Sequence, residues 1–188
     1  GEIVCIAGVQ GNGQTELSEA LLGTMMPVSG TVTLDGVDIT TAKPARTIKA
    51  GLGYVPEDRH RDGFVGEFSI AENLVLDNLD AYSRFGSLDL RAIAENAEAR
   101  IEEFDIRSSS YTQPVKSLSG GNQQKVDLAR ELSRPLTLLL ASQPTRGVDV
   151  GAIEFLHKRI VAERDQGTAV LIVSTELEEG ESLADRIA

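Results

Sequence analysis

The chain is poor in cysteine, in basic residues and in long apolar runs. Its 188 residues include a single cysteine, Cys5, which excludes an internal disulfide and fits a small core residue in a reducing compartment. There are 29 acidic residues against 18 lysines and arginines, and the net charge of −11 argues against a nucleic-acid partner, because phosphate backbones are bound by basic patches. Apolar runs reach only about six residues, whereas a membrane span needs ~20. We therefore expect one domain with its own core, and any membrane association to come through a partner.

A glycine-rich loop, Gly8-Val9-Gln10-Gly11-Asn12-Gly13-Gln14-Thr15, follows the apolar stretch at residues 3–7 and precedes a segment with helical apolar spacing. The loop has the spacing of the phosphate-binding motif G-x-x-x-x-G-K-[ST], but Gln14 replaces the lysine. Such a loop binds phosphate through backbone N–H groups and the helix N-terminus, so most of the binding surface survives without the ammonium. The predicted nucleotide-binding residues are Gly8, Gly11, Asn12, Gly13, Gln14 and Thr15. Taken alone, the loop could equally be a strand-to-helix turn that binds no ligand.

A second glycine motif, Leu118-Ser119-Gly120-Gly121, precedes a helical segment that contains Gln123. Ser119 before two glycines and a helix predicts a second anion-receptive helix N-terminus. The apolar run at residues 136–141 follows, and after it comes Ser142-Gln143-Pro144-Thr145-Arg146-Gly147-Val148-Asp149. The order of these motifs is far more specific than any one of them.

With these motifs the chain resembles the nucleotide-binding domain of ATP-binding cassette (ABC) transporters. More narrowly, it resembles the second of two such domains in the ATP-binding subunit of bacterial importers for pentoses, galactosides and nucleosides. The narrower resemblance is carried by Gly11–Gln14, Pro56–Arg59 with Arg61–Gly63, Gly121–Lys125 and Gln143–Gly147. It implies an α/β P-loop ATPase with a mainly parallel sheet, a small antiparallel edge and an inserted helical subdomain.

The resemblance also implies which catalytic groups are missing. Gln14 stands where the family has the lysine of the phosphate-binding loop. Ser142 and Gln143 stand where it has the aspartate that holds Mg²⁺ and the glutamate that activates water. Thr175 stands in the place of the switch histidine, and Glu57 in the place of the glutamine that contacts Mg²⁺ and water. We therefore expect no catalytic residue here, with Thr15 as a weak Mg²⁺ ligand and with ATP and Mg²⁺ weakly held or absent. Whether this cassette hydrolyses ATP by itself is left open.

The same resemblance implies the partners. Cassettes pair head to tail, so Leu118, Ser119, Gly120, Gly121 and Gln123 would complete the ATP site of a second cassette, in the same full-length chain. Asp149 would lie at the pairing surface, or cap the following helix, or both. Transmembrane permease subunits would contact the segment from Glu57 to Asn73, which places the protein in the cytoplasm at the inner face of the cell membrane. The transported sugar or nucleoside is not encoded here.

We expect one nucleotide-binding domain over residues 1–188, excised from a longer protein, with its core at 1–57 and 118–188 and its helical subdomain at about 69–114. Strands are predicted at residues 3–7, 30–34, 52–55, 136–141 and 169–174. Asp35-Gly36 predicts a hairpin, Ser69 to Glu72 a capping box, and residues 90–104 a helix. His60 and His157 lack metal-ligand spacing. Arg59 and Arg61 could contact phosphate or the acidic groups of a partner, but we interpret both as solvated loop charges.

Three functions remain: a degenerate cassette of an importer, an independently active ABC ATPase, and a non-transport cassette protein of DNA repair or translation. The acidic composition and the lack of a long coiled-coil insertion disfavour the third.

Overall fold

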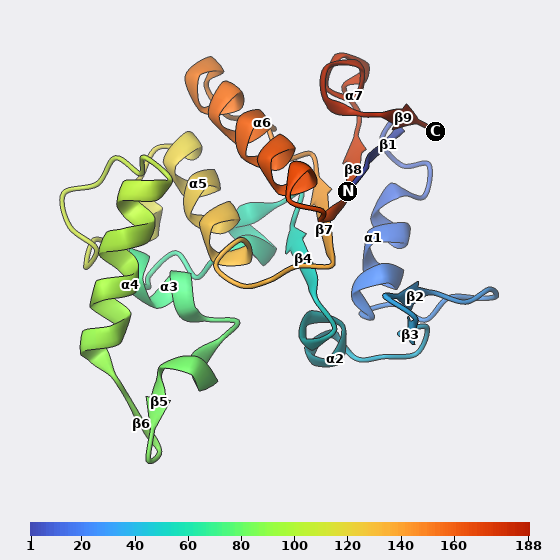
Figure 1. Cartoon of the computed structure of the whole chain (residues 1–188). Coiled ribbons are helices and arrows are strands. Elements are labelled where there is room, and N and C mark those ends of the chain that lie inside the picture. Colours follow the sequence, from blue (N-terminus) through green and yellow to red (C-terminus); the bar gives the residue numbers. More distant parts are fainter. The chain divides into compact units, whose positions relative to one another are not determined.

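The computed structural model describes all of residues 1–188 and divides into two compact units (Figure 1). The first unit comprises residues 1–57, 135–144 and 157–188, and the second comprises residues 58–134 and 145–156. No helix is long and apolar enough to cross a membrane.

The first unit is built on a five-stranded sheet with the order β4-β7-β8-β1-β9. The strands are β1 (Ile3–Ala7), β4 (Leu52–Val55), β7 (Leu138–Ser142), β8 (Ala169–Ser174) and β9 (Arg186–Ile187), and every pairing in the sheet is parallel. Helices α1 (Gln14–Leu22), α2 (Pro44–Lys49) and α7 (Leu177–Leu183) belong to this unit, and α7 packs against β1 and β8. The near-continuous apolar strands fit a sheet covered on both faces, and Ile3, Cys5, Leu139, Leu140 and Ile172 are fully buried.

A two-stranded antiparallel sheet pairs β2 (Thr33–Leu34) with β3 (Val37–Asp38), and Asp35 and Gly36 between them both have positive φ. This confirms the predicted hairpin and the small antiparallel sheet. Leu34 and Ile39 are buried beside Leu52, which anchors the hairpin to the first unit. The predicted strand at residues 30–34 is wrong over its first three residues. Gly30 has a φ of 91°, and the Val32 N–H donates to the Thr40 side chain instead of to a strand.

The other strand predictions hold closely: β1, β4 and β8 have the expected bounds. Strand β7 begins two residues later than predicted and ends at Ser142, because the ladder with β4 starts with Leu138 opposite Leu52. The N–H of Thr137, one residue earlier, donates to the carbonyl of Gly51 at 2.8 Å.

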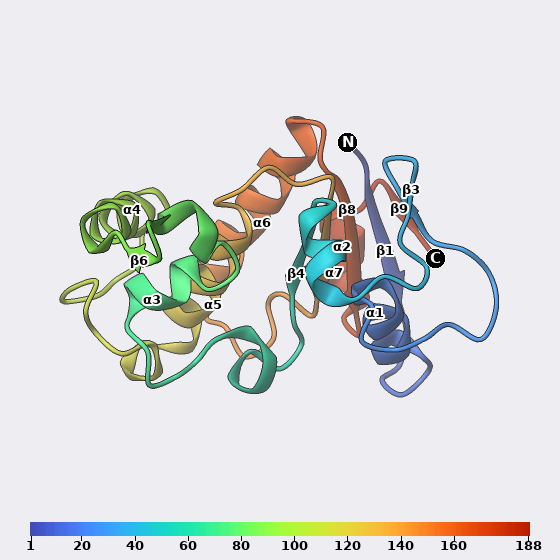
Figure 2. The ribbon, with the colours of Figure 1, turned by 90° about the horizontal axis from the view of Figure 1, so that it is seen from below.

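The second unit is helical. It contains η1 (Arg59–Gly63), α3 (Ile70–Val75), η2 (Leu79–Tyr82), α4 (Leu90–Glu103), η3 (Val115–Ser117) and α5 (Gly120–Glu131), with a short hairpin of β5 (Ser83–Arg84) and β6 (Ser87–Leu88). Helices α3, α4 and α5 lie side by side in both views (Figures 1 and 2). Buried apolar side chains of these helices include Ile70, Leu74, Ala97 and Leu128, and Phe104, directly after α4, is also buried.

The helix ends of this unit follow the sequence signals. The capping box at Ser69 is confirmed: Ser69 accepts from the Glu72 N–H at 3.2 Å, and Glu72 accepts from the Ser69 N–H at 2.8 Å. Asp89 caps α4 through the Ala92 N–H, and α4 ends one residue before the predicted Phe104. Helix α6 (Val150–Asp165) begins in the second unit and continues into the first.

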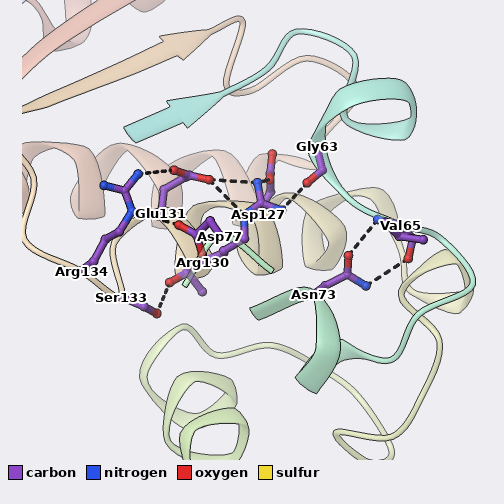
Figure 3. Close-up of polar contacts among 10 residues, drawn as sticks. Gly63, Val65, Asn73, Asp77, Asp127, Arg130, Glu131, Ser133 and Arg134 are labelled. Carbon is purple, nitrogen blue, oxygen red and sulfur yellow. Dashed lines mark hydrogen bonds and ion pairs between the residues drawn. The ribbon is translucent and has the colours of Figure 1, made fainter. Parts of the chain in front are cut away.

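A buried cluster of charged side chains extends along α5 (Figure 3). Asp127 is fully buried, and its Oδ1 atom lies 2.6 Å from Arg130 Nη2. Arg130 also contacts Glu131 and donates to the carbonyl of Gly63, and Glu131 in turn contacts Arg134, whose Nε is 2.9 Å from Asp77. The Asp127 Oδ2 atom has no hydrogen-bond partner. Burial raises the pKa of Asp127 to about 7, although Arg130 opposes the shift.

This carboxyl group predicts a pH-dependent stability. Its pKa lies above the ordinary value of about 3.9, so the folded chain binds more protons than the unfolded chain between about pH 4 and about pH 7. The free energy of unfolding should therefore fall as the pH rises through this window. Asp127→Asn should flatten that dependence, by up to about 1.4 kcal/mol per pH unit, as measured by urea unfolding between about pH 5 and about pH 8.

The matched control is Asp62→Asn, since Asp62 pairs with Arg61 on the surface. If the free energy of unfolding fell equally steeply with pH in the wild type and in Asp127→Asn, the raised pKa of Asp127 would be contradicted.

Candidate functional site

The glycine-rich loop leaves the carboxyl end of β1 and enters α1 at Gln14. Strands β1 and β8 pair in parallel with Ala7 opposite Ser174, and β7 pairs with β8 so that Ser142 is opposite Val173. The segments after these strands therefore begin at one edge of the sheet. This edge brings Gly8, Gln143 and Thr175 to the same end of the first unit, and Glu57 follows β4 there.

The side chain of Gln14 folds back over the loop that contains it. Its Oε1 accepts from the N–H of Asn12 at 3.0 Å, and its Nε2 donates to the carbonyl of Val9 at 3.0 Å. Gly11 and Gly13 have φ values of 92° and 96°, which a residue with a Cβ rarely adopts, so glycine is needed for this curvature. One N–H of the loop is thus bound by the chain itself.

Neutral side chains lie at and directly after the end of β7, at the two positions where the family resemblance implies carboxylates, and they bind neighbouring side chains. Ser142 is buried, and its Oγ lies 3.1 Å from Ser18 Oγ on α1. Gln143 Oε1 accepts from Thr175 Oγ1 at 3.4 Å, and the Gln143 N–H donates to the Val173 carbonyl at 2.7 Å. Glu57 Oε1 accepts from Gln10 Nε2 at 3.0 Å. Ser18 was missed from the sequence, where a serine four residues after Gln14 carries no distinguishing signal.

This edge of the sheet offers N–H groups that can bind a phosphate group, but few of the oxygen ligands that Mg²⁺ prefers. The first-turn N–H groups of α1 have no acceptor within the helix, which favours an anion. Magnesium prefers carboxylate and water oxygens, and no group of three acidic, histidine or cysteine side chains in the chain is arranged to hold a metal ion. Thr15 is exposed at the start of α1 and offers a hydroxyl group as a ligand. Positions 142 and 143 hold Ser142 and Gln143, so neither adds a carboxylate.

The second glycine motif lies in the second unit, at the N-terminus of α5. Ser119 is the N-cap, but its side chain makes no bond to the first-turn N–H groups; instead its Oγ accepts from Asn122 Nδ2 at 2.9 Å. Ser119 is exposed, whereas Leu118 and Gly121 are buried. Gln123 is also buried, and its Nε2 donates to the Val115 carbonyl at 3.3 Å, so it fixes the turn that precedes the motif.

Gly120 and Gly121 pack against the segment that precedes α6. A Cβ on Gly121 would lie 2.7 Å from both Ala152 Cβ and Asp149 Oδ2, and a Cβ on Gly120 would lie 2.9 Å from the Gly147 carbonyl oxygen. Neither glycine can be replaced without moving this segment. Asp149 Oδ1 accepts from the Ala152 N–H at 3.0 Å, which confirms its predicted role as a helix cap.

The interpretation of Arg59 as a solvated loop charge is wrong. Its guanidinium is half-buried and donates to the carbonyl oxygens of Arg146 and Gly147. The partners are more than 80 positions away in the sequence, so no local pattern could have found them. Arg61 is exposed and pairs with Asp62, as a surface charge would. His157 Nε2 lies 3.5 Å from Glu179 Oε1.

The parallel sheet, the phosphate-binding loop and the glycine motif at the start of α5 define an ATP-binding cassette of the P-loop class. The family model for ABC transporters matches residues 1–146, and the chain belongs to this family.

Curated relatives include the nucleoside import ATP-binding protein NupA of Lactococcus lactis subsp. cremoris, 49% identical over 100% of this chain and 38% of its own length. The guanosine import ATP-binding protein NupO of Bacillus subtilis is 48% identical over 100% of the chain and 37% of its own. The ribose import ATP-binding protein RbsA of Chromobacterium violaceum is 41% identical over 100% and 37%. The chain thus spans little more than a third of these relatives.

Among solved structures, a dimeric ATP-binding cassette in a post-hydrolysis state, bound to ADP and Pi, superimposes with a TM-score of 0.82 at 22% identity. It covers 99% of this chain and 79% of the other. A nucleotide-free ATP-binding cassette gives a TM-score of 0.77 at 22% identity over 98% and 74%. These likenesses establish the α/β fold of an ABC ATPase with its mainly parallel sheet.

The Gln14 geometry predicts a gain of nucleotide affinity on Gln14→Lys. The substitution removes the amide from the Asn12 N–H and adds an ammonium, and charge-assisted hydrogen bonds contribute about 1.5–3 kcal/mol, so ATP affinity should rise at least about tenfold. Isothermal titration calorimetry with Mg·ATP measures this affinity.

Gln10→Lys is the matched control, because it adds the same charge to the same loop beside Glu57. Equal affinities for the two variants would contradict a specific role of position 14.

Proposed function

We propose that this chain is a catalytically degenerate nucleotide-binding cassette of an ABC importer for nucleosides or sugars. Its role is to complete the ATP site of a second cassette with its own Leu118–Gly121 motif. The observation that carries the proposal is the asymmetry between the two glycine motifs. The positions for lysine, aspartate, glutamate and histidine hold Gln14, Ser142, Gln143 and Thr175, whereas the motif at α5 keeps its exposed serine and both of its glycines.

The chemistry of the two motifs supports this division. Hydrolysis needs a base or a group that positions water, and phosphoryl transfer needs a metal to neutralise charge. Ser142 and Gln143 supply neither, and both are bound to neighbouring side chains. Stabilising phosphate from the opposite side needs only preorganised hydrogen-bond donors, which Ser119, Gly120 and Gly121 provide without carboxylates.

The import function is proposed from the relatives, whose names specify import of nucleosides, guanosine, glucose, ribose and xylose. Because each is nearly three times as long as this chain, it has room for a second cassette in the same polypeptide. We place the protein at the cytoplasmic face of the membrane, bound to permease subunits.

The permease contact is proposed for the segment from Glu57 to Asn73. This segment exposes two apolar side chains, Val65 and Phe68, each 41% exposed. Asn73 holds the segment in shape: its Oδ1 accepts from the Val65 N–H at 2.8 Å, and its Nδ2 donates to the Val65 carbonyl at 3.0 Å (Figure 3). A fixed backbone with exposed apolar groups suits a docking surface.

The alternative is an independently active ATPase, which would need Gln143 or Glu57 to position water. In the full-length subunit assembled with its permease, Ser119→Ala should lower kcat for ATP hydrolysis about tenfold or more, since a hydrogen bond to a charged group contributes about 1.5–3 kcal/mol. Gln143→Ala should leave kcat within about twofold, a difference of ~0.4 kcal/mol.

The opposite pattern, in which Gln143→Ala abolishes hydrolysis and Ser119→Ala is silent, would establish the independent ATPase. Phosphate release by the chain alone, over a range of concentrations, detects any activity of its own dimers.

A further inference from the structure

Arg59 joins the loop after β4 to the segment that precedes α6. It is the first residue of η1, and its Nη1 donates to the carbonyl oxygen of Arg146 at 2.8 Å and lies 3.4 Å from Gln124 Oε1 on α5. Its Nη2 donates to the carbonyl oxygen of Gly147 at 3.3 Å. One guanidinium therefore holds two consecutive carbonyl groups, a geometry that suits the planar fork of arginine and that lysine cannot reproduce.

These carbonyl groups belong to a turn that contacts Gly120 and Gly121. These two glycines belong to the Leu118–Gly121 motif, which we call the signature. The turn is closed by the Val148 N–H, which donates to the Thr145 carbonyl at 3.2 Å, and Gly147 adopts a φ of 66°. A Cβ on Gly120 would lie 2.8 Å from Arg59 Nη2 and 2.9 Å from the Gly147 oxygen. The arginine and the turn together form the surface against which the N-terminus of α5 is packed.

The other end of η1 is tied to the C-terminal half of α5. The Gly63 carbonyl accepts from Arg130, and a Cβ on Gly63 would lie 2.9 Å from Asp127 Oδ2 and 3.0 Å from the Cβ of Arg59. Asp58 caps η1 by accepting from the N–H groups of His60 and Arg61. The five residues from Arg59 to Gly63 are thus fixed at both ends, and a displacement of this loop moves the support of Gly120.

We propose that Arg59 is a positioning residue, which fixes the signature glycines through the carbonyl groups of Arg146 and Gly147 and so links the segment from Glu57 to Asn73 to the ATP site that the signature completes. The proposal rests on the proposed function, because only a signature that serves a partner's site gives this position a catalytic effect. Arg59 touches no reacting atom in this scheme; it acts through the turn and through Gly120.

The test uses the full-length subunit assembled with its permease and compares Arg59→Gln, Arg59→Lys and Arg91→Gln. Arg91 is a matched control in the same unit, where it forms an exposed pair with Glu95 on α4. Misplacement of a site by ~1 Å can cost ~10²-fold in rate, so Arg59→Gln should lower kcat for ATP hydrolysis at least about fivefold, with KM for ATP within about twofold. Arg59→Lys should be intermediate, because an ammonium can reach one carbonyl but not both.

Hydrogen exchange separates positioning from general destabilisation. The N–H of Gln123 bonds to Ser119, that of Val148 to Thr145 and that of Ile153 to Asp149. These amides should exchange faster in Arg59→Gln, while the amides of β1 and β8 exchange at the wild-type rate.

The proposal is overturned if Arg59→Gln and Arg91→Gln have the same kcat. It is also overturned if hydrogen exchange in Arg59→Gln rises equally in all helices and strands and kcat falls only in proportion to the fraction of folded protein. Ser119→Ala, measured in the same series, separates the two hypotheses. If Ser119→Ala retains wild-type kcat, the proposed function fails; if it loses activity and Arg59→Gln does not, the positioning role alone fails.

Discussion

The parallel register of β7, β8 and β1 is the constraint on which the candidate site depends. Pairing Ala7 with Ser174 and Ser142 with Val173 starts three loops at one edge of the sheet. Backbone geometry alone then places the glycine-rich loop beside Gln143 and Thr175, whatever side chains these positions carry. Ladder bonds and buried apolar strands hold this architecture, and neither needs a lysine or a carboxylate.

The glycine-rich loop and helix α5 use different polar chemistry. Around the loop, amides and hydroxyls satisfy one another, as Gln14 does with Val9 and Asn12 and as Ser18 does with Ser142. Along α5, buried charges hold the loop that contains Gly63. Buried ion pairs add less to stability than to a defined geometry in some proteins, because the charges must be desolvated. The charged cluster thus lies on the helix whose N-terminus carries the Leu118–Gly121 motif, while the neutral contacts lie around the glycine-rich loop.

Much of the fold could be predicted from local signals, and most side-chain contacts of the site could not. The bounds of β1, β4 and β8 follow from short apolar runs, and the Asp35-Gly36 hairpin and the Ser69 cap follow from residue preferences that act over two to four positions. The start of β7 was misplaced because it is set by the pairing of Leu138 with Leu52, a residue far away in the sequence. The folded-back Gln14, the Ser18–Ser142 contact and the Arg59 carbonyl contacts depend on loop curvature or on long-range packing, for which the sequence has no periodic signal.

The neutral pairing of Ser142 also bears on how such a site could change over generations. An aspartate at position 142 alone would place a carboxylate beside Ser18 at a site that is only 5% exposed, with no lysine at position 14 to compensate it. A glutamate at position 143 alone would lack both metal and ammonium. Each of these single substitutions therefore carries a cost in desolvation or an uncompensated charge, and compensation requires several substitutions at once. Single substitutions therefore preserve the uncharged side chains at this edge of the sheet more easily than they introduce charged ones.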